Sequence, residues 1–270
     1  MKLEAGQVAV VTGGASGIGR GMVDAFTRRG LAVVLADVEQ DALAGAVQEL
    51  ADRGDRGFGV RVDVRDPDQM TALAGRVLDE FGRVDVVCLN AGVVTTRLPV
   101  WQQPPEDWRW VLEVNLLGIA NGVRAFVPHL IRQRHGHVVN TSSIAGLSTI
   151  PGGGNGAYSA SKHAVVGMSE TLRLELDLVA PEVGVTVLCP GPVPSRIKDA
   201  ARNRPADLVA EVINADLSKP DFAMTLEPVP ADVVGEQVAA AIESGRMYLL
   251  PGPGTPELAR ARIERVLAEL

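Results

Sequence analysis

QVAVVTGGASGIG, residues 7–19, decides how this chain folds. Residues 7–11 are a short β-branched run, which is typical of a buried parallel strand. A glycine-rich turn follows at residues 12–19, and residues 20–29 have a helical pattern. Gly30 then ends the helix, as a C-terminal glycine commonly does. A strand, a glycine-rich turn and a helix therefore open an alternation that continues along the chain.

The alternation predicts one α/β domain over residues 1–270, a doubly wound parallel sheet of the Rossmann type with helices on both faces. Residues 193–230 interrupt it, which predicts a substrate-loop insertion. Pro128 is expected to kink the longest helix, because proline removes a backbone donor. After the first strand, the expected strands are at 31–36, 57–62, 84–89, 138–141, 183–188 and 247–250, about seven in all. The expected helices are at 20–29, 42–53, 67–81, 106–134, about 158–178, 232–243 and 256–270.

Composition narrows the class of protein. The 270 residues are 46% hydrophobic and 22% charged, which is ordinary for a globular protein. The net charge of −7 argues against nucleic-acid binding, since phosphate recognition needs a basic surface. Cys88 and Cys189 each follow an apolar run and are expected to be buried thiols in a reducing compartment. The N-terminus has too little apolar length for a signal peptide, and we find no uncharged apolar run of about 18 residues. We therefore expect a cytoplasmic protein that binds no membrane.

Polar residues follow several of the predicted strands. Thr12, Asp37, Asp63, Asn90 and Ser143 each stand at the carboxyl end of one. Ligands of doubly wound sheets bind at these ends. The sequence therefore predicts one site along this edge of the sheet.

The glycine-rich turn predicts a dinucleotide site. Gly13, Gly17 and Gly19 are spaced G-x-x-x-G-x-G. Glycines allow a tight turn and close approach to a pyrophosphate, and the following helix supplies N–H donors and a positive dipole. The alternative is a glycine-rich turn that binds nothing.

Asp37 predicts which dinucleotide binds. A carboxylate at the end of the second strand can accept both hydroxyls of an adenosine ribose, and it would repel a 2′-phosphate. No lysine or arginine stands at residues 38–40, and Ser16 rather than a basic residue lies in the glycine turn. We therefore predict NAD over NADP as the cofactor. The alternative for Asp37 is a helix cap or a turn residue.

Residues 138–162 carry the expected chemistry. Tyr158 and Lys162 are four residues apart and share one face of a helix. A nearby ammonium favours the phenolate, and a phenol that titrates near pH ~10 needs this help to act as a base near neutrality. Ser143, at the preceding strand end, could donate a hydrogen bond to a substrate oxygen. The three residues together indicate proton transfer at an alcohol or a carbonyl.

These motifs together resemble the classical short-chain dehydrogenase/reductase family, from residue 7 to about residue 195. The resemblance implies that Tyr158 exchanges a proton with the substrate oxygen and that Ser143 positions and polarises that oxygen. It also implies that Lys162 binds the nicotinamide ribose and lowers the pKa of Tyr158, and that Asn115 holds a water that links Lys162 to solvent. The residues it implies for the cofactor are Thr12, Gly13, Ser16, Gly17, Ile18, Gly19, Asp37, Asp63, Val64, Asn90, Ala91, Gly92, Tyr158, Lys162, Pro190, Gly191, Val193 and Ser195.

The sequence departs from the family pattern in two places. Ser143 stands two residues further from Tyr158 than is usual, with the extra length in the loop 151–156, so Ser142 is an alternative. The family's Pro-Gly-x-Val-x-Thr is Pro-Gly-Pro-Val-Pro-Ser at residues 190–195. The serine keeps the hydroxyl that would meet the nicotinamide carboxamide, and the extra prolines are expected to stiffen the segment.

The leading hypothesis is an NAD-dependent oxidoreductase that interconverts a secondary alcohol and a ketone. The alternatives are an NAD(H)-binding regulator without turnover, an NADP-dependent carbonyl reductase, and an epimerase or dehydratase of nucleotide sugars. The last usually needs a larger C-terminal region than the eighty or so residues after Cys189. An apolar substrate is suggested by Ile197, Leu208, Val212, Leu217, Phe222 and Met224 in the expected lid.

Three further expectations concern metals, aromatic residues and assembly. We predict no metal site, because the four histidines lack metal-ligand spacing with acidic or cysteine partners: His129, His135, His137 and His163. The tryptophans are expected to pack around the long helix: Trp101, Trp108 and Trp110. The resemblance implies a homodimer or homotetramer that pairs the long helix and the helix bearing Tyr158.

Overall fold

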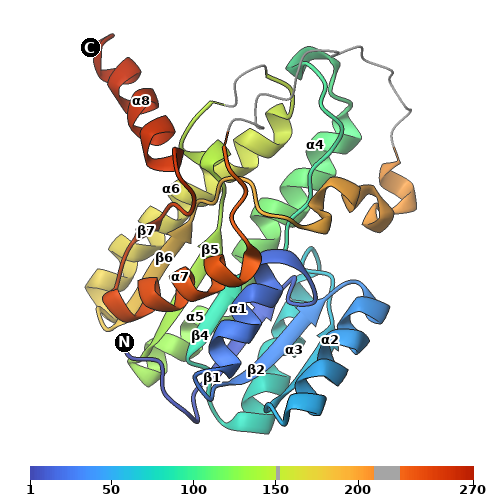
Figure 1. The fold of residues 1–270 in the computed structure, drawn as a ribbon, viewed down its shortest axis with the longest axis vertical. Helices are drawn as coiled ribbons and strands as arrows, with labels where there is room; N and C mark the ends of the chain where they lie inside the picture. Colours follow the sequence, from blue (N-terminus) through green and yellow to red (C-terminus); the bar gives the residue numbers. More distant parts are fainter. Residues whose placement is uncertain (150–152, 210–225) are drawn as a thin grey trace.

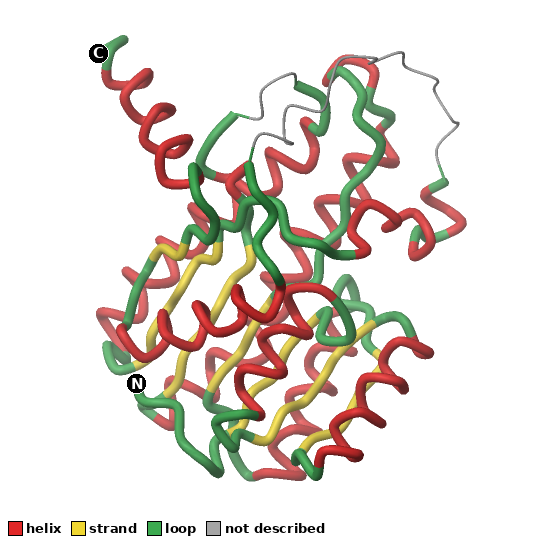
Figure 2. Tube along the Cα trace, in the orientation of Figure 1, coloured by secondary structure: helices red, strands yellow, loops and turns green. Residues whose placement is uncertain are grey.

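The computed structural model describes residues 1–149, 153–209 and 226–270, which build one parallel sheet between two layers of helices (Figures 1 and 2). The strand order is β3-β2-β1-β4-β5-β6-β7, so the direction of winding reverses between β1 and β4. The predicted doubly wound sheet of seven parallel strands is confirmed. The strands are β1 Val8–Thr12, β2 Ala32–Asp37, β3 Gly57–Arg61, β4 Val86–Leu89, β5 Gly136–Thr141, β6 Val183–Leu188 and β7 Tyr248–Leu249.

The inner strands β1, β2, β4, β5 and β6 are buried on both faces, which explains their apolar runs, whereas the edge strands β3 and β7 are partly exposed. Side chains alternate along β1: Val8 and Val10 join the core on one face, and Ala9 and Val11 join the core on the other. Helices α1, α2 and α7 cover the second of these faces, and α3, α4, α5 and α6 cover the first. The helices are α1 Gly17–Thr27, α2 Gln40–Arg53, α3 Pro67–Phe81, α4 Pro105–Leu112, α5 Gly118–Gln133, α6 Gly156–Val179, α7 Ala231–Ser244 and α8 Thr255–Leu267.

Helices α1 and α7 touch through their backbones and lie side by side on one face of the sheet (Figure 1). A Cβ on Gly21 would lie 2.0 Å from the carbonyl oxygen of Ala231, and a Cβ on Gly235 would lie 2.1 Å from that of Gly21. No side chain fits at either position. This pair of glycines therefore brings α7 over the strands that carry the glycine turn.

The helix predicted at residues 106–134 is irregular at a different place from the expected one, Pro128. Helix α5 runs through Pro128 without interruption, and the break from α-helical geometry is a π-helical turn at Glu113–Leu117. Within the described residues, the stretch Pro105–Gln133 is the one helix long and apolar enough to span a membrane by length and composition. More than half of its most apolar window is buried inside the protein, as in the core helix of a globular protein.

The three tryptophans do not behave alike. Trp110 is fully buried and Trp108 packs partly buried against the core, as expected. Trp101 is 85% exposed on a 3₁₀ turn at Val100–Gln102, so the packing prediction is wrong for this residue. Both cysteines are buried free thiols, as predicted; the reducing compartment stays a prediction.

The segment after β6 is described in part. It forms 3₁₀ turns at Arg196–Asn203 and Ala206–Leu208. Ile197 lines a pocket and Leu208 joins the core. The other proposed lid residues lie outside the described residues: Val212, Leu217, Phe222 and Met224. The substrate-loop insertion at 193–230 stays a prediction.

Candidate active site

A pocket of about 440 Å³ opens at the carboxyl ends of the strands. The structure brings most of the predicted site residues to its wall. These are Gly13, Ser16, Gly17, Ile18, Asp37, Asp63, Val64, Asn90, Ala91, Gly92, Ser143, Tyr158, Lys162, Pro190, Gly191, Val193 and Ser195. Thr12, Gly19 and Asn115 are not part of the wall, and each supports it from behind.

Thr12 ties the ends of β1 and β4 together. Its Oγ1 accepts hydrogen bonds from the backbone N–H groups of Asn90 at 2.8 Å and Ala91 at 3.1 Å. The Asn90 side chain returns a bond, since its Nδ2 donates to the Thr12 carbonyl oxygen at 3.0 Å. Thr141, at the end of β5, donates to Asn90 Oδ1 at 3.2 Å. The floor of the pocket is therefore a hydrogen-bonded seam across three strands.

Gly19 holds the start of α1 against the glycine turn. A Cβ there would lie 2.0 Å from the Gly13 carbonyl oxygen, so only glycine fits. Ser16, the residue before α1, makes no capping bond through its side chain. Ser16, Gly17 and Ile18 line the pocket, so the uncapped first turn of α1 offers N–H donors and a positive dipole to an anion there. This cradle fits the pyrophosphate of a dinucleotide.

Asp37 is anchored at the end of β2, where the family pattern implies an adenosine ribose. Its Oδ2 accepts from the Ala15 N–H at 3.1 Å, and its Oδ1 accepts from the Glu39 N–H at 3.1 Å. Burial raises the pKa of Asp37, and these backbone bonds oppose that rise. The Asp37 carboxylate lines the pocket and can accept further hydrogen bonds there, so it fits the two hydroxyls of a ribose.

Asp63 shares its carboxylate with a residue that sequence analysis missed. Arg65 donates to it from its backbone N–H at 3.0 Å and from its guanidinium Nη2 at 2.6 Å. Arg65 also lies 3.4 Å from Glu113. Any contact of Asp63 with an adenine is therefore made by a carboxylate that Arg65 already orients. Val64 beside it is buried.

Ser143, Tyr158 and Lys162 converge on the opposite side of the pocket. The Lys162 Nζ donates to the Thr141 carbonyl oxygen at 2.9 Å and lies 5.6 Å from the centre of the Tyr158 ring. The Ser143 hydroxyl lies close enough to the Tyr158 phenol to lower its pKa. The three groups that the family pattern implies for proton transfer are therefore in mutual reach.

The pKa of Tyr158 differs from the expectation. Burial raises it, and the neighbouring Ser143 hydroxyl lowers it by less. Burial also lowers the pKa of Lys162 to about 8. The expected depression of the Tyr158 pKa by Lys162 is not found in this structure, because desolvation disfavours both charged groups.

The geometry separates Ser143 from its alternative, Ser142. The Ser142 hydroxyl donates to the Lys162 backbone carbonyl at 2.8 Å. This bond stabilises the position of α6 and uses the proton that Ser142 could otherwise donate to a substrate oxygen. Ser143 begins a 3₁₀ turn, where its Oγ accepts from the Ala145 N–H at 3.1 Å. Its hydroxyl proton remains for another acceptor, so Ser143 has the geometry to polarise a substrate oxygen.

Asn115 lies inside the π-helical turn between α4 and α5. Its Oδ1 accepts from the Val93 N–H at 2.8 Å, and its Nδ2 donates to the Val93 carbonyl at 3.0 Å and to Ser161 Oγ at 3.2 Å. It is fully buried. Asn115 therefore ties the loop after β4 to Ser161 on α6, three positions after Tyr158. π-helical turns of this kind frequently occur at functional sites. Sequence periodicity carried no signal for this turn.

The segment that starts at Pro190 is held at its base. The Pro190 carbonyl accepts from the Ile144 N–H at 2.9 Å, and the Pro192 carbonyl accepts from the Val229 N–H at 2.9 Å. The Gly191 N–H donates to the Pro251 carbonyl at 3.2 Å. These bonds place the segment beside Ser143 and close the pocket on that side.

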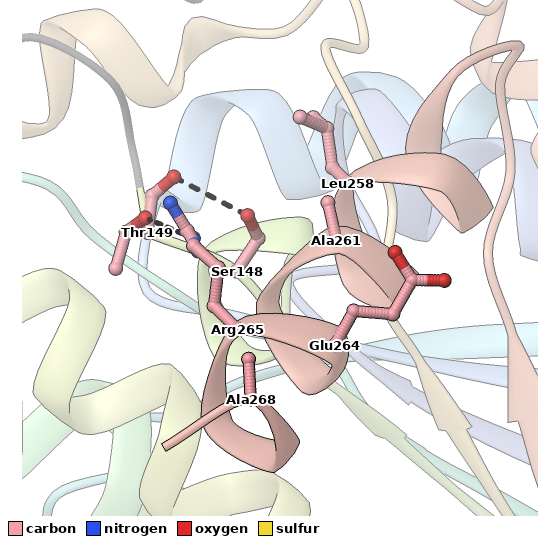
Figure 3. Close-up of a pocket in the computed structure, with 7 residues that line it drawn as sticks. All are labelled: Ser148, Thr149, Leu258, Ala261, Glu264, Arg265 and Ala268. Atoms are coloured by element: carbon pink, nitrogen blue, oxygen red, sulfur yellow. Dashed lines mark hydrogen bonds between the residues drawn. The ribbon is translucent and has the colours of Figure 1, made fainter.

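A second hollow, of about 470 Å³, adjoins the first (Figure 3). Arg265 reaches from α8 and donates to Thr149 Oγ1 at 3.1 Å, while the Ser148 hydroxyl donates to the Thr149 carbonyl at 3.3 Å. Ser148, Thr149 and Leu258 line both hollows. Helix α8, which extends away from the sheet in Figure 1, is therefore a wall of the site that sequence analysis had not assigned.

The described residues, 1–149, 153–209 and 226–270, contain no group of three or more His, Cys, Asp or Glu side chains arranged to hold a metal ion. One of the histidines, His137, is buried and hydrogen-bonded at 2.8 Å to the Thr186 hydroxyl.

Comparisons with known proteins agree with this geometry. The family model of short chain dehydrogenases matches residues 7–206. The chain is 37% identical to a 1-deoxy-11-beta-hydroxypentalenate dehydrogenase of Streptomyces arenae, over 96% of this chain and 87% of that protein. It is also 37% identical to a 3beta-hydroxysteroid dehydrogenase 2 of Eggerthella lenta, over 69% of this chain and 71% of that protein.

Among solved structures, the fold is similar to a short chain dehydrogenase/reductase from Burkholderia phymatum in complex with NAD. The TM-score is 0.93 and the identity 37%, with all of this chain and 96% of that chain covered. The predicted nicotinamide cofactor is confirmed as the ligand class of this site. The chain belongs to the short-chain dehydrogenase family, and it is an oxidoreductase that acts on a hydroxyl or ketone group of a small molecule.

Proposed function

We propose that the protein is an NAD-dependent oxidoreductase that interconverts a secondary alcohol and a ketone. The observation that carries this proposal is the convergence of Ser143, Tyr158 and Lys162 in the pocket that also holds the glycine turn. The nicotinamide supplies or accepts the hydride at the carbinol carbon. The chain itself has to bind both partners, orient the oxygen and move one proton.

Tyr158 is the proposed acid and base. Ser143 donates to the substrate oxygen and polarises a carbonyl, while Tyr158 gives that oxygen a proton in reduction or takes one in oxidation. The burial that raises the pKa of Tyr158 favours the neutral phenol, which is the form that donates. Oxidation needs the phenolate as the base. Asn115 positions Lys162 and α6 by fixing the loop after β4.

NAD is the proposed cofactor because Asp37 presents a carboxylate to the ribose end of the pocket. Such a group accepts hydroxyls and repels a 2′-phosphate. The Burkholderia phymatum structure, which was solved with NAD, supports this choice. The test is the ratio of NAD to NADP efficiency in the wild type and in Asp37→Ala. Equal use of both cofactors by the wild type would overturn the assignment, and a preference for NADP would favour an NADP-dependent carbonyl reductase.

The proposed substrate is a medium-sized, largely apolar alcohol or ketone. The pocket wall includes Val93, Trp110, Ile144, Leu226 and Leu258 near the catalytic residues. Two relatives are named for substrates of that kind, a pentalenate and a 3beta-hydroxysteroid. An apolar wall binds fused hydrocarbon rings by burying their surface.

The decisive experiment is NAD reduction by the purified protein with a panel of secondary alcohols that includes terpenoid and steroid alcohols. Tyr158→Phe is the matched control, because it removes one hydroxyl and keeps the ring. Turnover that this variant loses supports the proposal. The competing regulator that binds NAD(H) without turnover predicts NADH binding in both proteins and no turnover in either.

We also propose a homodimer or homotetramer in the cytoplasm, with small molecules and copies of the chain as partners and neither nucleic acid nor membrane. Helix α6 leaves Leu174, Leu178 and Val179 exposed at 68%, 85% and 55%. A partner copy on this helix would bury them. Light scattering that shows a monomer at micromolar concentration contradicts this assembly.

A further inference from the structure

Glu39 stands beside the ribose end of the pocket. It follows Asp37 by two residues, and its backbone N–H donates to Asp37 Oδ1 at 3.1 Å. Its carboxylate binds three side chains of the segment after β6. Arg202 and Asn203 donate to Oε1, the latter at 3.0 Å, and Arg196 Nη1 lies 3.1 Å from Oε2. The guanidinium of Arg202 is the main cause that lowers the pKa of Glu39.

Arg202 is held in place by more than Glu39. The Nη1 of Arg202 donates to the carbonyl oxygens of Arg196 at 2.8 Å and Asp199 at 2.7 Å. Ser195, just before them, lies against the glycine turn, since a Cβ on Gly17 would be 2.9 Å from the Ser195 Cβ. The segment therefore lies over the end of the pocket that contains the glycine turn. The backbone carbonyls of Arg196 and Asp199 still hold Arg202 when Glu39 is replaced.

Charge explains what Glu39 does there. Asp37, Glu39, Arg196 and Arg202 all line the same pocket. A 2′-phosphate carries close to two negative charges near neutrality and accepts bidentate bonds from guanidinium groups. Two guanidinium groups within reach of the ribose end would form such a site, except that Glu39 already pairs with both of them and supplies the opposing charge.

We propose that Glu39 is a second selectivity residue for the cofactor, which occupies Arg196 and Arg202 and so keeps them from binding a 2′-phosphate. This inference rests on the proposed preference for NAD. Selectivity is then divided between two carboxylates. Asp37 repels the phosphate directly, and Glu39 withholds the cations that would bind it. Replacement of Asp37 alone leaves the second mechanism in place.

The test measures binding of cofactor fragments, so that it does not depend on turnover. Adenosine 2′,5′-bisphosphate carries the 2′-phosphate, and 5′-AMP is the matched ligand without it. Titration calorimetry with the full chain compares the wild type, Asp37→Ser and the double variant Asp37→Ser/Glu39→Gln. A charge-assisted hydrogen bond is worth about tenfold or more in affinity. We expect the double variant to bind the bisphosphate at least about tenfold more tightly than Asp37→Ser does, with 5′-AMP affinity nearly unchanged.

Further replacement of Arg196 and Arg202 by glutamine in the double variant is the control. It should remove the gain, and added salt should weaken the gain because the contact is ionic. Glu39 makes no capping bond to α2 through its side chain, so Glu39→Gln leaves that helix cap intact. If the double variant does not fold, Glu39→Gln alone tests the same direction of change.

Two results overturn the inference: no gain for the bisphosphate on loss of the Glu39 charge, or a gain that survives removal of both arginines. A different result overturns the proposed NAD preference itself. That result is a wild-type protein that binds the bisphosphate as tightly as 5′-AMP.

Discussion

The buried imidazole of His137 makes the stability of the fold depend on pH. His137 is 1% exposed on β5, and its Nε2 lies 2.8 Å from Thr186 Oγ1. The Thr186 hydroxyl donates to the Arg246 carbonyl at 2.6 Å, so its proton is used. The Nε2 of His137 must then be the donor, so the neutral imidazole is the tautomer that carries its proton on Nε2. Burial lowers the pKa of His137 to about 3, and the positive charges of the N-terminus and Arg173 add to this effect.

The size of the effect follows from the two states of the chain. In the unfolded chain the imidazole titrates near pH ~6.5. Below that pH the His137 imidazole is protonated in the unfolded chain, whereas in the folded protein it stays neutral down to about pH 3. The free energy of unfolding therefore keeps this contribution above pH ~6.5 and loses it as the pH falls. At about 1.4 kcal/mol per pH unit, the loss at pH 5 is about 2 kcal/mol.

Urea unfolding at pH 7 and at pH 5 measures this loss, with His137→Gln as the comparison. Glutamine keeps an N–H donor for Thr186 and does not titrate. Carboxylates and the other histidines contribute equally to both proteins, so they cancel in the difference. We expect the wild type to lose about 2 kcal/mol more than the variant between the two pH values. Equal losses in the two proteins would refute the assignment of a neutral, buried His137.

Three further changes test the packing. Gly235→Ala puts a Cβ 2.1 Å from the backbone oxygen of Gly21, so we expect a loss of about 1–3 kcal/mol that exceeds the gain in helix propensity. Gly75→Ala, in open space on α3, should instead stabilise the protein by up to about 1 kcal/mol, and thermal unfolding distinguishes the two. Asp107→Asn leaves the guanidinium of Arg204, 2.6 Å away and 13% exposed, without its charge partner, and should cost about 3 kcal/mol in urea unfolding. A loss below about 1 kcal/mol would show that this ion pair is screened like a surface pair.

The sheet was predictable from sequence because most of its strands are short apolar runs rich in β-branched residues, and several of these runs end at a polar residue. Burial on both faces requires such runs, and the alternation with helices requires parallel pairing. The glycine turn was predictable for a similar reason. Gly19 has no room for a Cβ, so the residue type itself records the close approach of two backbones.

The turn that holds Asn115 was not predictable in the same way. Residues 105–133 have the apolar spacing of one continuous helix, and a proline at 128 was the only visible break. Helix α5 accommodates Pro128, whereas the Asn115 side chain bonds to Val93 on a different segment. The irregular turn depends on a tertiary contact, which a helical period cannot reveal.

The charged residues near Asp37 could not be fully predicted from sequence for the same reason. Residues 38–40, which follow Asp37 in the sequence, contain no lysine or arginine. The arginines of the site come instead from a segment about 160 residues later, and Arg202 meets Glu39 across a separation of 163 positions. The winding of the sheet reverses between β1 and β4, so a segment that leaves β6 must cross the strand ends to reach the end of β2. Two elements on opposite sides of that reversal therefore build the ribose end together. The sequence near β2 identifies Asp37, and only the assembled pocket shows that Glu39 pairs with Arg196 and Arg202.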